Sequence, residues 1–282
     1  MNNSITNKIN NLLFLGRYHK PYGSLLLMWP CFWGVAYDNQ ISANNLWYLF
    51  LLGLGSFIMR GAGCTINDIL DVSYDKKVSR TKERPMAKKK ITLVEAIIFL
   101  FFQLFLGLLI VINFSPKTII LAFSIIPMIF IYPLFKRFTY FPQIVLGIIF
   151  NWGIIVGFSC SNEFFNKEIL FLYFAGVFLT IGYDTIYSFQ DIEDDIKVGV
   201  KSMGLITRKN PKFYIGLIYL ISLILFSLTF FTIHGATTVC FVTVLIIFFY
   251  FFFQIKKIKL EDKDMLQKIF VSNSLFGGVI FL

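Results

Sequence analysis

Long apolar runs recur along the whole chain and are separated by mostly short polar segments. Each run comes close to the ~20 mostly apolar residues that an α-helix needs to cross a lipid bilayer. The runs lack the alternation of apolar and polar residues that is typical of transmembrane β-strands. The pattern therefore predicts an all-α integral membrane protein with about nine transmembrane helices. The predicted spans are Tyr22–Tyr37, Leu46–Ile66, Thr92–Phe114, Thr118–Phe135, Pro142–Cys160, Ile169–Phe189, Phe213–Ile233, Ala236–Gln254 and Leu266–Leu282.

No part of the chain has the composition of a separate soluble region, so we expect a single transmembrane domain over residues 1–282. Residues 1–20 are polar and are expected to form a cytoplasmic N-terminal segment. They lead directly into a long apolar span, so we expect no cleavable signal peptide. Two longer polar loops, residues 72–91 and 191–212, are rich in charge and are the places to look for chemistry.

The composition supports lipid as the surrounding solvent. The chain is 57% hydrophobic and only 15% charged, whereas about a quarter of the residues of a soluble domain are charged. The four cysteines stand singly in apolar stretches, with no pair at the spacing of a metal or redox site.

The net charge of +10 raises the question of a nucleic-acid partner, which the placement of the charges answers. Lys and Arg gather in the cytoplasmic loops of membrane proteins. If the N-terminus is cytoplasmic, the outer loops hold only Lys117 and Lys167. The inner segments hold Lys8, Arg17 and Lys20, residues 76–90, Lys136 and Arg137, residues 197–212 and residues 256–268. Membrane topology thus accounts for the basic charge, and we expect no nucleic-acid partner.

Two acidic clusters begin where the second and sixth predicted spans reach the cytoplasmic face. In the first, Asn67, Asp71 and Asp75 recur every four residues, which places them on one helical face. In the second, Asp191 and Asp195 have the same spacing. Mg²⁺ prefers such oxygen ligands and is usually held by carboxylates together with substrate phosphates. The alternative is that both clusters are solvated loop ends whose acids pair with neighbouring lysines.

Basic side chains near these clusters suit a metal-bridged anion such as a diphosphate, because guanidinium groups donate paired hydrogen bonds to phosphate oxygens. Each could instead serve only as a cytoplasmic topology residue. The candidates are Arg80, Arg84, Lys136, Arg137 and Lys201.

Five further polar residues lie within predicted spans, where they are costly. Arg60 precedes Asn67 by about two helical turns, and it could pair with Asp68 or Asp71 or receive an anionic group of a substrate. Asn151, Tyr183, Asp184 and Tyr187 also lie at membrane depth, although the two tyrosines could be interface residues.

These motifs resemble the UbiA superfamily of intramembrane prenyltransferases, and within it the branch that acts on 4-hydroxybenzoate. The superfamily carries Asn-Asp-x-x-Asp-x-x-x-Asp in one loop region and Asp-x-x-x-Asp in another, which here are Asn67–Asp75 and Asp191–Asp195. The branch is indicated by Lys20-Pro21-Tyr22-Gly23 and Arg84-Pro85, together with Lys136-Arg137, Tyr183–Tyr187 and Gly199–Ser202. His19 departs from the pattern, where an acidic residue is expected.

The resemblance implies a helical bundle around a central cavity, with the acidic motifs at its cytoplasmic end. It implies Mg²⁺ as cofactor and two substrates, a polyprenyl diphosphate and 4-hydroxybenzoate. The diphosphate leaves, the ring carbon ortho to the hydroxyl attacks the allylic cation, and the product serves ubiquinone biosynthesis. A bacterial inner membrane is the expected location, with the mitochondrial inner membrane as the alternative.

The resemblance also implies roles for individual residues. The expected metal ligands are Asn67, Asp71, Asp191 and Asp195. The expected catalytic residues are Asp71, Asp75, Asp191, Asp195 and Arg137. The expected substrate-binding residues are Arg60, Arg80, Arg84, Lys136, Lys201, Asn151 and Tyr187.

Two competing functions stay open at this point. A sister prenyltransferase would use another acceptor, and only the strings outside the acidic motifs argue against it. A divalent-cation transporter would place its carboxylates near the middle of the membrane in discontinuous helices. Here both acidic clusters lie at the ends of spans, beside many basic residues.

Overall fold

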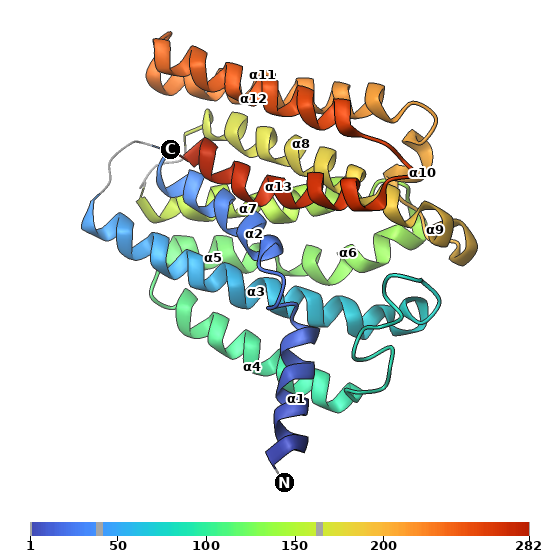
Figure 1. Cartoon of the computed structure of the whole chain (residues 1–282). Helices are drawn as coiled ribbons and strands as arrows, with labels where there is room; N and C mark the ends of the chain where they lie inside the picture. Colours follow the sequence, from blue (N-terminus) through green and yellow to red (C-terminus); the bar gives the residue numbers. More distant parts are fainter. Residues whose placement is uncertain (1, 38–41, 162–165, 282) are drawn as a thin grey trace.

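The computed structural model describes residues 2–37, 42–161 and 166–281, and within these ranges every regular element is a helix (Figure 1). Met1 and Leu282, at the limits of the predicted domain, lie outside the described residues. The elements are α1 (Asn2–Leu15), α2 (Tyr22–Val35), α3 (Ala43–Asp75), α4 (Leu93–Val111), α5 (Pro116–Ser124), α6 (Ile126–Phe138), α7 (Pro142–Ser161), α8 (Ile169–Ser188), the 3₁₀ turn η1 (Phe189–Asp191), α9 (Ile192–Val198), α10 (Met203–Thr207), α11 (Pro211–His234), α12 (Thr238–Lys257) and α13 (Lys263–Phe281).

Seven helical stretches of the described chain are long and apolar enough to cross a membrane. They coincide with seven of the nine predicted spans, and the prediction of an all-α membrane protein is confirmed. The two other spans correspond to α2 and α13. With 14 residues, α2 is shorter than the ~20 residues of a typical span, and α13 begins with Lys263 and Asp264. The count of nine therefore stays a prediction.

The predicted span Thr118–Phe135 is a broken helix. It consists of α5, which ends at Ser124, and α6, which begins at Ile126. Pro127 explains the break, because proline has no backbone N–H to continue the hydrogen-bond ladder and its ring clashes with the preceding turn.

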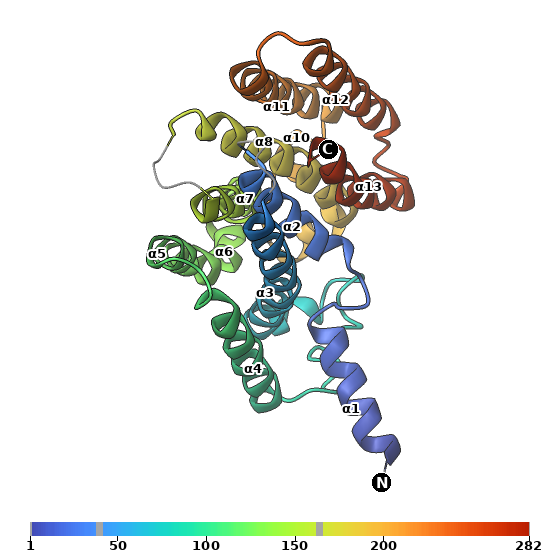
Figure 2. The ribbon, with the colours of Figure 1, turned by 90° about the vertical axis from the view of Figure 1, so that its left-hand side faces the viewer.

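The long helices lie side by side in one bundle, and Figure 2 shows most of them end-on. In this bundle α3 packs against α2 and α4, and α7 packs against α2 and α8. On the other side α11 packs against α8 and α12, while α13 rests on α2 and α8. Helix α1 lies outside the bundle and extends to the bottom of both views.

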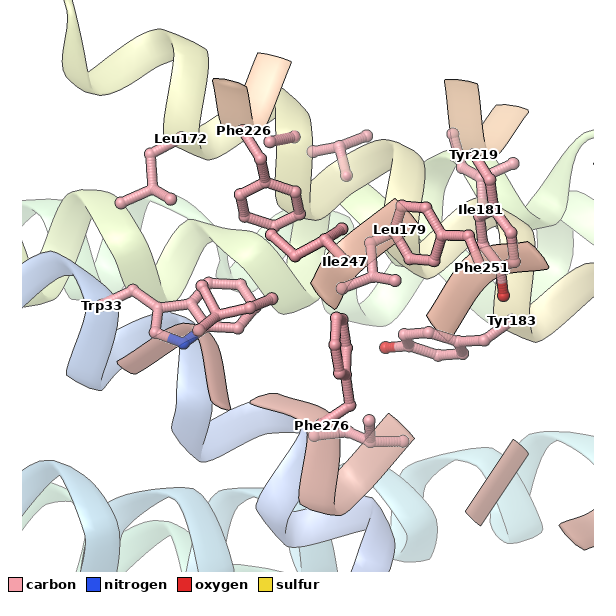
Figure 3. Packing of buried hydrophobic residues seen from close by; sticks show 14 of the residues in the cluster. Trp33, Leu172, Leu179, Ile181, Tyr183, Tyr219, Phe226, Ile247, Phe251 and Phe276 are labelled. Atoms are coloured by element: carbon pink, nitrogen blue, oxygen red, sulfur yellow. The ribbon is translucent and has the colours of Figure 1, made fainter. Parts of the chain in front are cut away.

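Aromatic and aliphatic side chains together fill the core between α2, α8, α11, α12 and α13 (Figure 3). Phe226 meets Trp33 edge to face, and Tyr219 stacks on Phe251. The outer helices show the reverse pattern, since Phe101 on α4 is 67% exposed and Phe241 on α12 is 57% exposed. Large exposed apolar surface is typical of a face that contacts a membrane or another protein, which agrees with the predicted membrane environment.

Glycines bring the backbones of α2 and α7 into direct contact. A Cβ atom on Gly34 would lie 2.1 Å from the carbonyl oxygen of Ile154. One on Gly157 would lie 2.1 Å from the carbonyl oxygen of Cys31. Small residues allow such close helix packing inside membranes, where dispersion contacts between helices replace the hydrophobic effect as the main attraction.

We predict that Gly157→Val pushes α2 away from α7 and destabilises the folded protein. Overpacking of this kind costs about 1–3 kcal/mol or more, which should appear as a lower thermal unfolding temperature in detergent. The matched control is Gly216→Ala in α11, whose added Cβ would meet only the Cδ1 atom of Ile255, at 3.9 Å. Equal unfolding temperatures for the two variants would contradict the role of the α2–α7 contact.

Candidate active site

The first acidic motif lies near the C-terminal end of α3, which is 33 residues long. Asn67, Asp71 and Asp75 follow one another along the face of this helix, as their spacing predicted. Asp71 is fully buried, Asp75 is 6% exposed and Asn67 is half-buried. The motif thus stands inside the protein, next to the loop that follows α3, and it is not a solvated loop end.

Asp71 is neutralised from α6. Lys136, in the last turn of α6, forms an ion pair with its Oδ2 atom. Arg137 follows, with its Nη2 atom 3.7 Å from Asp71 Oδ1, and it donates a hydrogen bond to the carbonyl oxygen of Leu70. Within the described part of the chain, two buried atoms here have no hydrogen-bond partner, namely Asp71 Oδ1 and Arg137 Nε. The site therefore keeps an unused acceptor and an unused donor close together.

A chain of ion pairs joins the two other aspartates of the first motif. Arg84 donates to both carboxylate oxygens of Asp75, at 2.9 and 2.7 Å, and to Asp68 at 3.0 Å. Arg17, in the connection between α1 and α2, donates to the same oxygen of Asp68 at 2.7 Å. Asp68 is 1% exposed, and a buried carboxylate of this kind depends on its cationic partners.

The second acidic motif follows α8, in η1 and α9, and the loop after α3 reaches it. Arg80 donates two hydrogen bonds to the carboxylate of Asp191, of 2.9 and 2.6 Å, and a third to the hydroxyl of Tyr187. Burial alone would lower the pKa of Arg80, but its interactions with Tyr187 and Asp191 raise that pKa overall. The backbone N–H and the hydroxyl group of Ser79 each donate a hydrogen bond to the carboxylate of Asp194.

A third loop, after α9, completes the arrangement. The hydroxyl of Ser202 donates to Asp195 at 3.1 Å. The backbone N–H of Lys201 donates to the carbonyl of Lys136, and its ammonium group donates to the carbonyl of Phe138. The loops after α3, α6 and α9 therefore meet at one end of the bundle, at the right of Figure 1.

Two candidates lie deeper in the bundle. Arg60 forms no ion pair within the described chain, so the pairing with Asp68 or Asp71 considered from the sequence does not occur. Its Nη1 atom donates to Cys64 Sγ, and its guanidinium lies 5.8 Å from the ring centre of Phe150. Asn151 instead links α7 to α8 through Thr180, at 2.8 Å. That contact is a helix-packing one, and its substrate role stays a prediction.

The acids do not pair with neighbouring lysines, the alternative considered for both clusters, and the one short-range pair among the described site residues joins Asp75 to Arg84, nine residues later. The cations on Asp68, Asp71 and Asp191 come from segments 16 to 111 residues away in the chain. Among the described residues, the side-chain carboxylate of Asp195 accepts a hydrogen bond from Ser202 alone.

The donor atoms suit a hard divalent cation. Carboxylate and amide oxygens are the ligands that Mg²⁺ prefers, and Asp71 Oδ1 is buried without a hydrogen-bond partner. Among the described residues, no three acidic, histidine or cysteine side chains already converge on one point. Lysine and arginine side chains now bond to the carboxylate oxygens of Asp71 and Asp191. A metal ion would have to displace these side chains to bind the same oxygens.

Sequence reasoning did not single out Arg17 or Asp68 as site residues. Their contact spans 51 residues of sequence, and no local pattern signals it. The one local hint is that Asp68 adjoins Asn67 in the motif. Ser79 was not singled out either, because serine in a polar loop is ordinary, and Ser202 entered only as part of the string Gly199–Ser202.

Comparison with known proteins places this chain in a family. The model of the UbiA prenyltransferase family matches residues 27–277. The mitochondrial 4-hydroxybenzoate polyprenyltransferase of Drosophila pseudoobscura pseudoobscura is 45% identical over 203 residues, which cover 71% of this chain and 51% of that protein. The chain thus spans about half the length of that relative. The 4-hydroxybenzoate octaprenyltransferase of Psychromonas ingrahamii is 37% identical over 267 residues, 95% of this chain and 92% of the relative.

A solved structure agrees in fold. A UbiA homolog from Archaeoglobus fulgidus, bound to GPP and Mg²⁺, superposes with a TM-score of 0.70 at 17% identity, covering 96% of this chain and all of the other. The family match over residues 27–277 and the shared helical bundle lead to one conclusion: this chain is an integral membrane protein that belongs to the UbiA prenyltransferase family.

Proposed function

We propose that this protein transfers a polyprenyl group from a polyprenyl diphosphate to 4-hydroxybenzoate, at the ring carbon ortho to the hydroxyl, in ubiquinone biosynthesis. The observation that carries the proposal is the meeting of two acidic motifs and five basic side chains at one end of an apolar bundle. Arg80, Arg84, Lys136, Arg137 and Lys201 all lie there. The relatives named for this reaction support the choice of acceptor.

The metal would be Mg²⁺, held by Asn67 and Asp71 on α3 and by Asp191 and Asp195 after α8. When bound, the metal neutralises charge on the departing diphosphate, as cations do for transferring phosphoryl groups. Among the described residues Asp71 Oδ1 accepts no hydrogen bond, and its nearest cation, Arg137 Nη2, is 3.7 Å away, which supports this assignment. Asp75 is further from that atom along α3 and is held by Arg84, so we assign it to metal binding or to holding Arg84 in place.

The basic residues lie at two depths in the helical bundle. Arg80, Arg84, Lys136 and Arg137 contact the aspartates directly, so they are positioned to bind the diphosphate once the metal takes the carboxylates. Arg60 lies about two helical turns below Asn67, and its buried Nε atom has no hydrogen-bond partner among the residues that the structure describes. We therefore assign Arg60 to the carboxylate of the aromatic acceptor. Tyr187 accepts a hydrogen bond from Arg80, and Lys201 donates one to the carbonyl oxygen of Phe138 at the end of α6.

The surroundings protect the reactive cation. An allylic cation is trapped by water, so the site must be dry, and the apolar, Phe-rich helices of the bundle provide this dryness. The prenyl chain would lie against them. We place the whole reaction in one transmembrane domain, residues 1–282, within a bacterial inner membrane and with the acidic end facing the cytoplasm. The basic loops at that end support the orientation.

Two alternatives remain as outcomes of experiment. A sister prenyltransferase would use the same acidic motifs with another acceptor. A divalent-cation transporter is disfavoured, because the family is one of prenyltransferases and because the carboxylates lie at helix ends beside cations.

The first prediction concerns the reaction itself. Membrane-held or detergent-solubilised protein, given labelled 4-hydroxybenzoate and a polyprenyl diphosphate, should form a lipid-soluble labelled product with Mg²⁺ and none with EDTA. Diphosphate release that requires another acceptor would keep the family and replace the substrate. Folded protein that turns over no acceptor at all would contradict a transferase function.

The second prediction concerns the carboxylates. Asp71→Asn and Asp191→Asn should each lower turnover by at least about 10²-fold, the usual effect of removing one electrostatic contact to a developing charge. Both proteins should still insert and purify. The matched control is Glu193→Gln, an exposed acid in the second motif, which should turn over normally. Near-normal turnover of both aspartate variants would exclude their role in metal binding.

The third prediction concerns Arg17. Because Arg84 serves both Asp68 and Asp75, removing Arg17 leaves Arg84 as the one remaining partner of Asp68 among the described residues. Arg17→Gln should therefore destabilise the protein, by up to the roughly 3–5 kcal/mol of a broken buried pair, and raise the KM for the prenyl diphosphate. The double variant Arg17→Gln, Asp68→Asn should recover much of both losses. A double variant as impaired as the sum of the single variants would show that the two residues act separately.

A further inference from the structure

Helix α1 is amphipathic, and its apolar face is exposed. Ile5, Ile9 and Leu13 recur every four residues, so they line one face of the helix. Their exposed fractions are 57%, 52% and 44%. Asn7 and Asn11 have the same spacing on the opposite face, where Asn7 is exposed and Asn11 is half-buried. This separation of faces is typical of a helix that lies between an apolar and an aqueous environment.

The sequence of α1 would not hold a helix in water by itself. Five of its 14 residues are asparagines, which have a low intrinsic helix propensity. An isolated helix of this length is marginal in water even when its residues are strong helix formers. The helical conformation of α1 must therefore be stabilised by contacts of its apolar face.

The C-terminal part of α1 is fixed at the end of the bundle that carries the acidic motifs. Leu15 is fully buried and packs in one cluster with Met86 and Ile91, from the loop after α3. The same loop supplies the arginines that bind the aspartates of the site. Lys8 forms an ion pair with Glu95, in the first turn of α4. The position of α1 along the bundle is thus well defined.

Helix α1 runs across the long helices. In Figure 1 the bundle extends from left to right and α1 points downward. In Figure 2, where most of the long helices are seen end-on, α1 is again seen from the side. Because the long helices cross the membrane, a helix that runs across them lies along the membrane plane.

The lipid-facing surface of α4 begins beside α1. Val94, Ile98 and Phe101 are 65%, 63% and 67% exposed, and they belong to the membrane-spanning stretch Leu93–Val111. The ion pair of Lys8 joins α1 to the first turn of this same helix. The exposed apolar face of α1 therefore lies next to a surface that lipid already covers.

Lysines flank α1 at the level expected for lipid headgroups. Lys20 follows α1 and is exposed. Lys89 and Lys90 are exposed and directly precede Ile91, which packs against the end of α1. Lysines next to a membrane surface are attracted to anionic lipid headgroups. Charge complementarity thus favours lipid over a further protein as the partner of this surface.

We propose that α1 is an interfacial helix that docks on the lipid leaflet at the acidic end of the bundle, with Ile5, Ile9 and Leu13 among the acyl chains and Asn7 and Asn11 toward water. In the proposed orientation this is the cytoplasmic leaflet. The N-terminal segment expected in the cytoplasm then lies in the membrane surface. The proposal does not depend on the reaction that the protein catalyses.

The test measures the surroundings of single side chains in full-length protein held in phosphatidylcholine–phosphatidylglycerol vesicles. Ile9→Cys and Asn7→Cys are labelled with a nitroxide, and collisions with oxygen, which concentrates in lipid, and with a water-soluble nickel chelate are compared by electron paramagnetic resonance. Ile98→Cys on α4 serves as the lipid-facing reference and Glu193→Cys as the water-facing one. Wild type treated with the same label gives the background from the four native cysteines.

The ratio of oxygen to nickel collisions should be several-fold higher at position 9 than at position 7. Position 9 should resemble position 98, and position 7 should resemble position 193. Nickel that reaches position 9 as freely as position 7 would place α1 in water and overturn the proposal. An immobile label at position 9 that neither reagent reaches would show a protein partner, such as a second copy of this chain, and would overturn it too. If Ile9→Cys does not fold, Ile5→Cys and Leu13→Cys give the same comparison on the same face.

Discussion

Carboxylates inside an apolar bundle must be compensated, and the polar end of this protein is arranged around that requirement. Asp68, Asp71, Asp75 and Asp191 are each held by a basic side chain, and in most cases that side chain comes from a distant segment. Removing one partner of a buried ion pair typically costs several kcal/mol. The same contacts that keep the charges tolerable therefore also bring the loops after α3, α6 and α9 to one place.

This compensation is well suited to an exchange of partners. A divalent cation can take over the carboxylates, and the released arginines and lysines can then bind an anion of matching charge. The total charge of the site changes little in such an exchange, so the bundle need not rearrange to accommodate both ligands. Lys136 and Arg80 are the clearest examples, because each bonds to an aspartate of one of the two motifs.

The sequence predicts the membrane fold and the two acidic motifs well, because both are local patterns. Hydropathy identifies α3, α7 and α8, and a spacing of four places Asn67, Asp71 and Asp75 on one helical face. The break between α5 and α6 was missed, although Pro127 gives its physical reason.

Long-range pairing is harder to predict from sequence. Nothing in the sequence near Arg17 points to Asp68, and nothing near Arg80 points to Asp191 (111 residues away). From the sequence, Arg60 could form an ion pair with Asp68 or Asp71, or bind an anionic group of a substrate. Only the structure shows that, among the described residues, both aspartates pair with other cations.

The contacts of α2 also bear on how the protein is made. Trp29 and Trp33 donate their indole N–H groups to the carbonyl oxygens of Ser274 and Gly277 in α13, about 245 residues later. Neither helix is among the seven clear spans: α2 has only 14 residues, and α13 begins with the charged residues Lys263 and Asp264. During synthesis α2 leaves the ribosome early, and its native partner emerges near the end of translation. The helices of the bundle therefore cannot all pack in order from the N-terminus. The hydrogen bonds between α2 and α13 can form only after α13 has been synthesised.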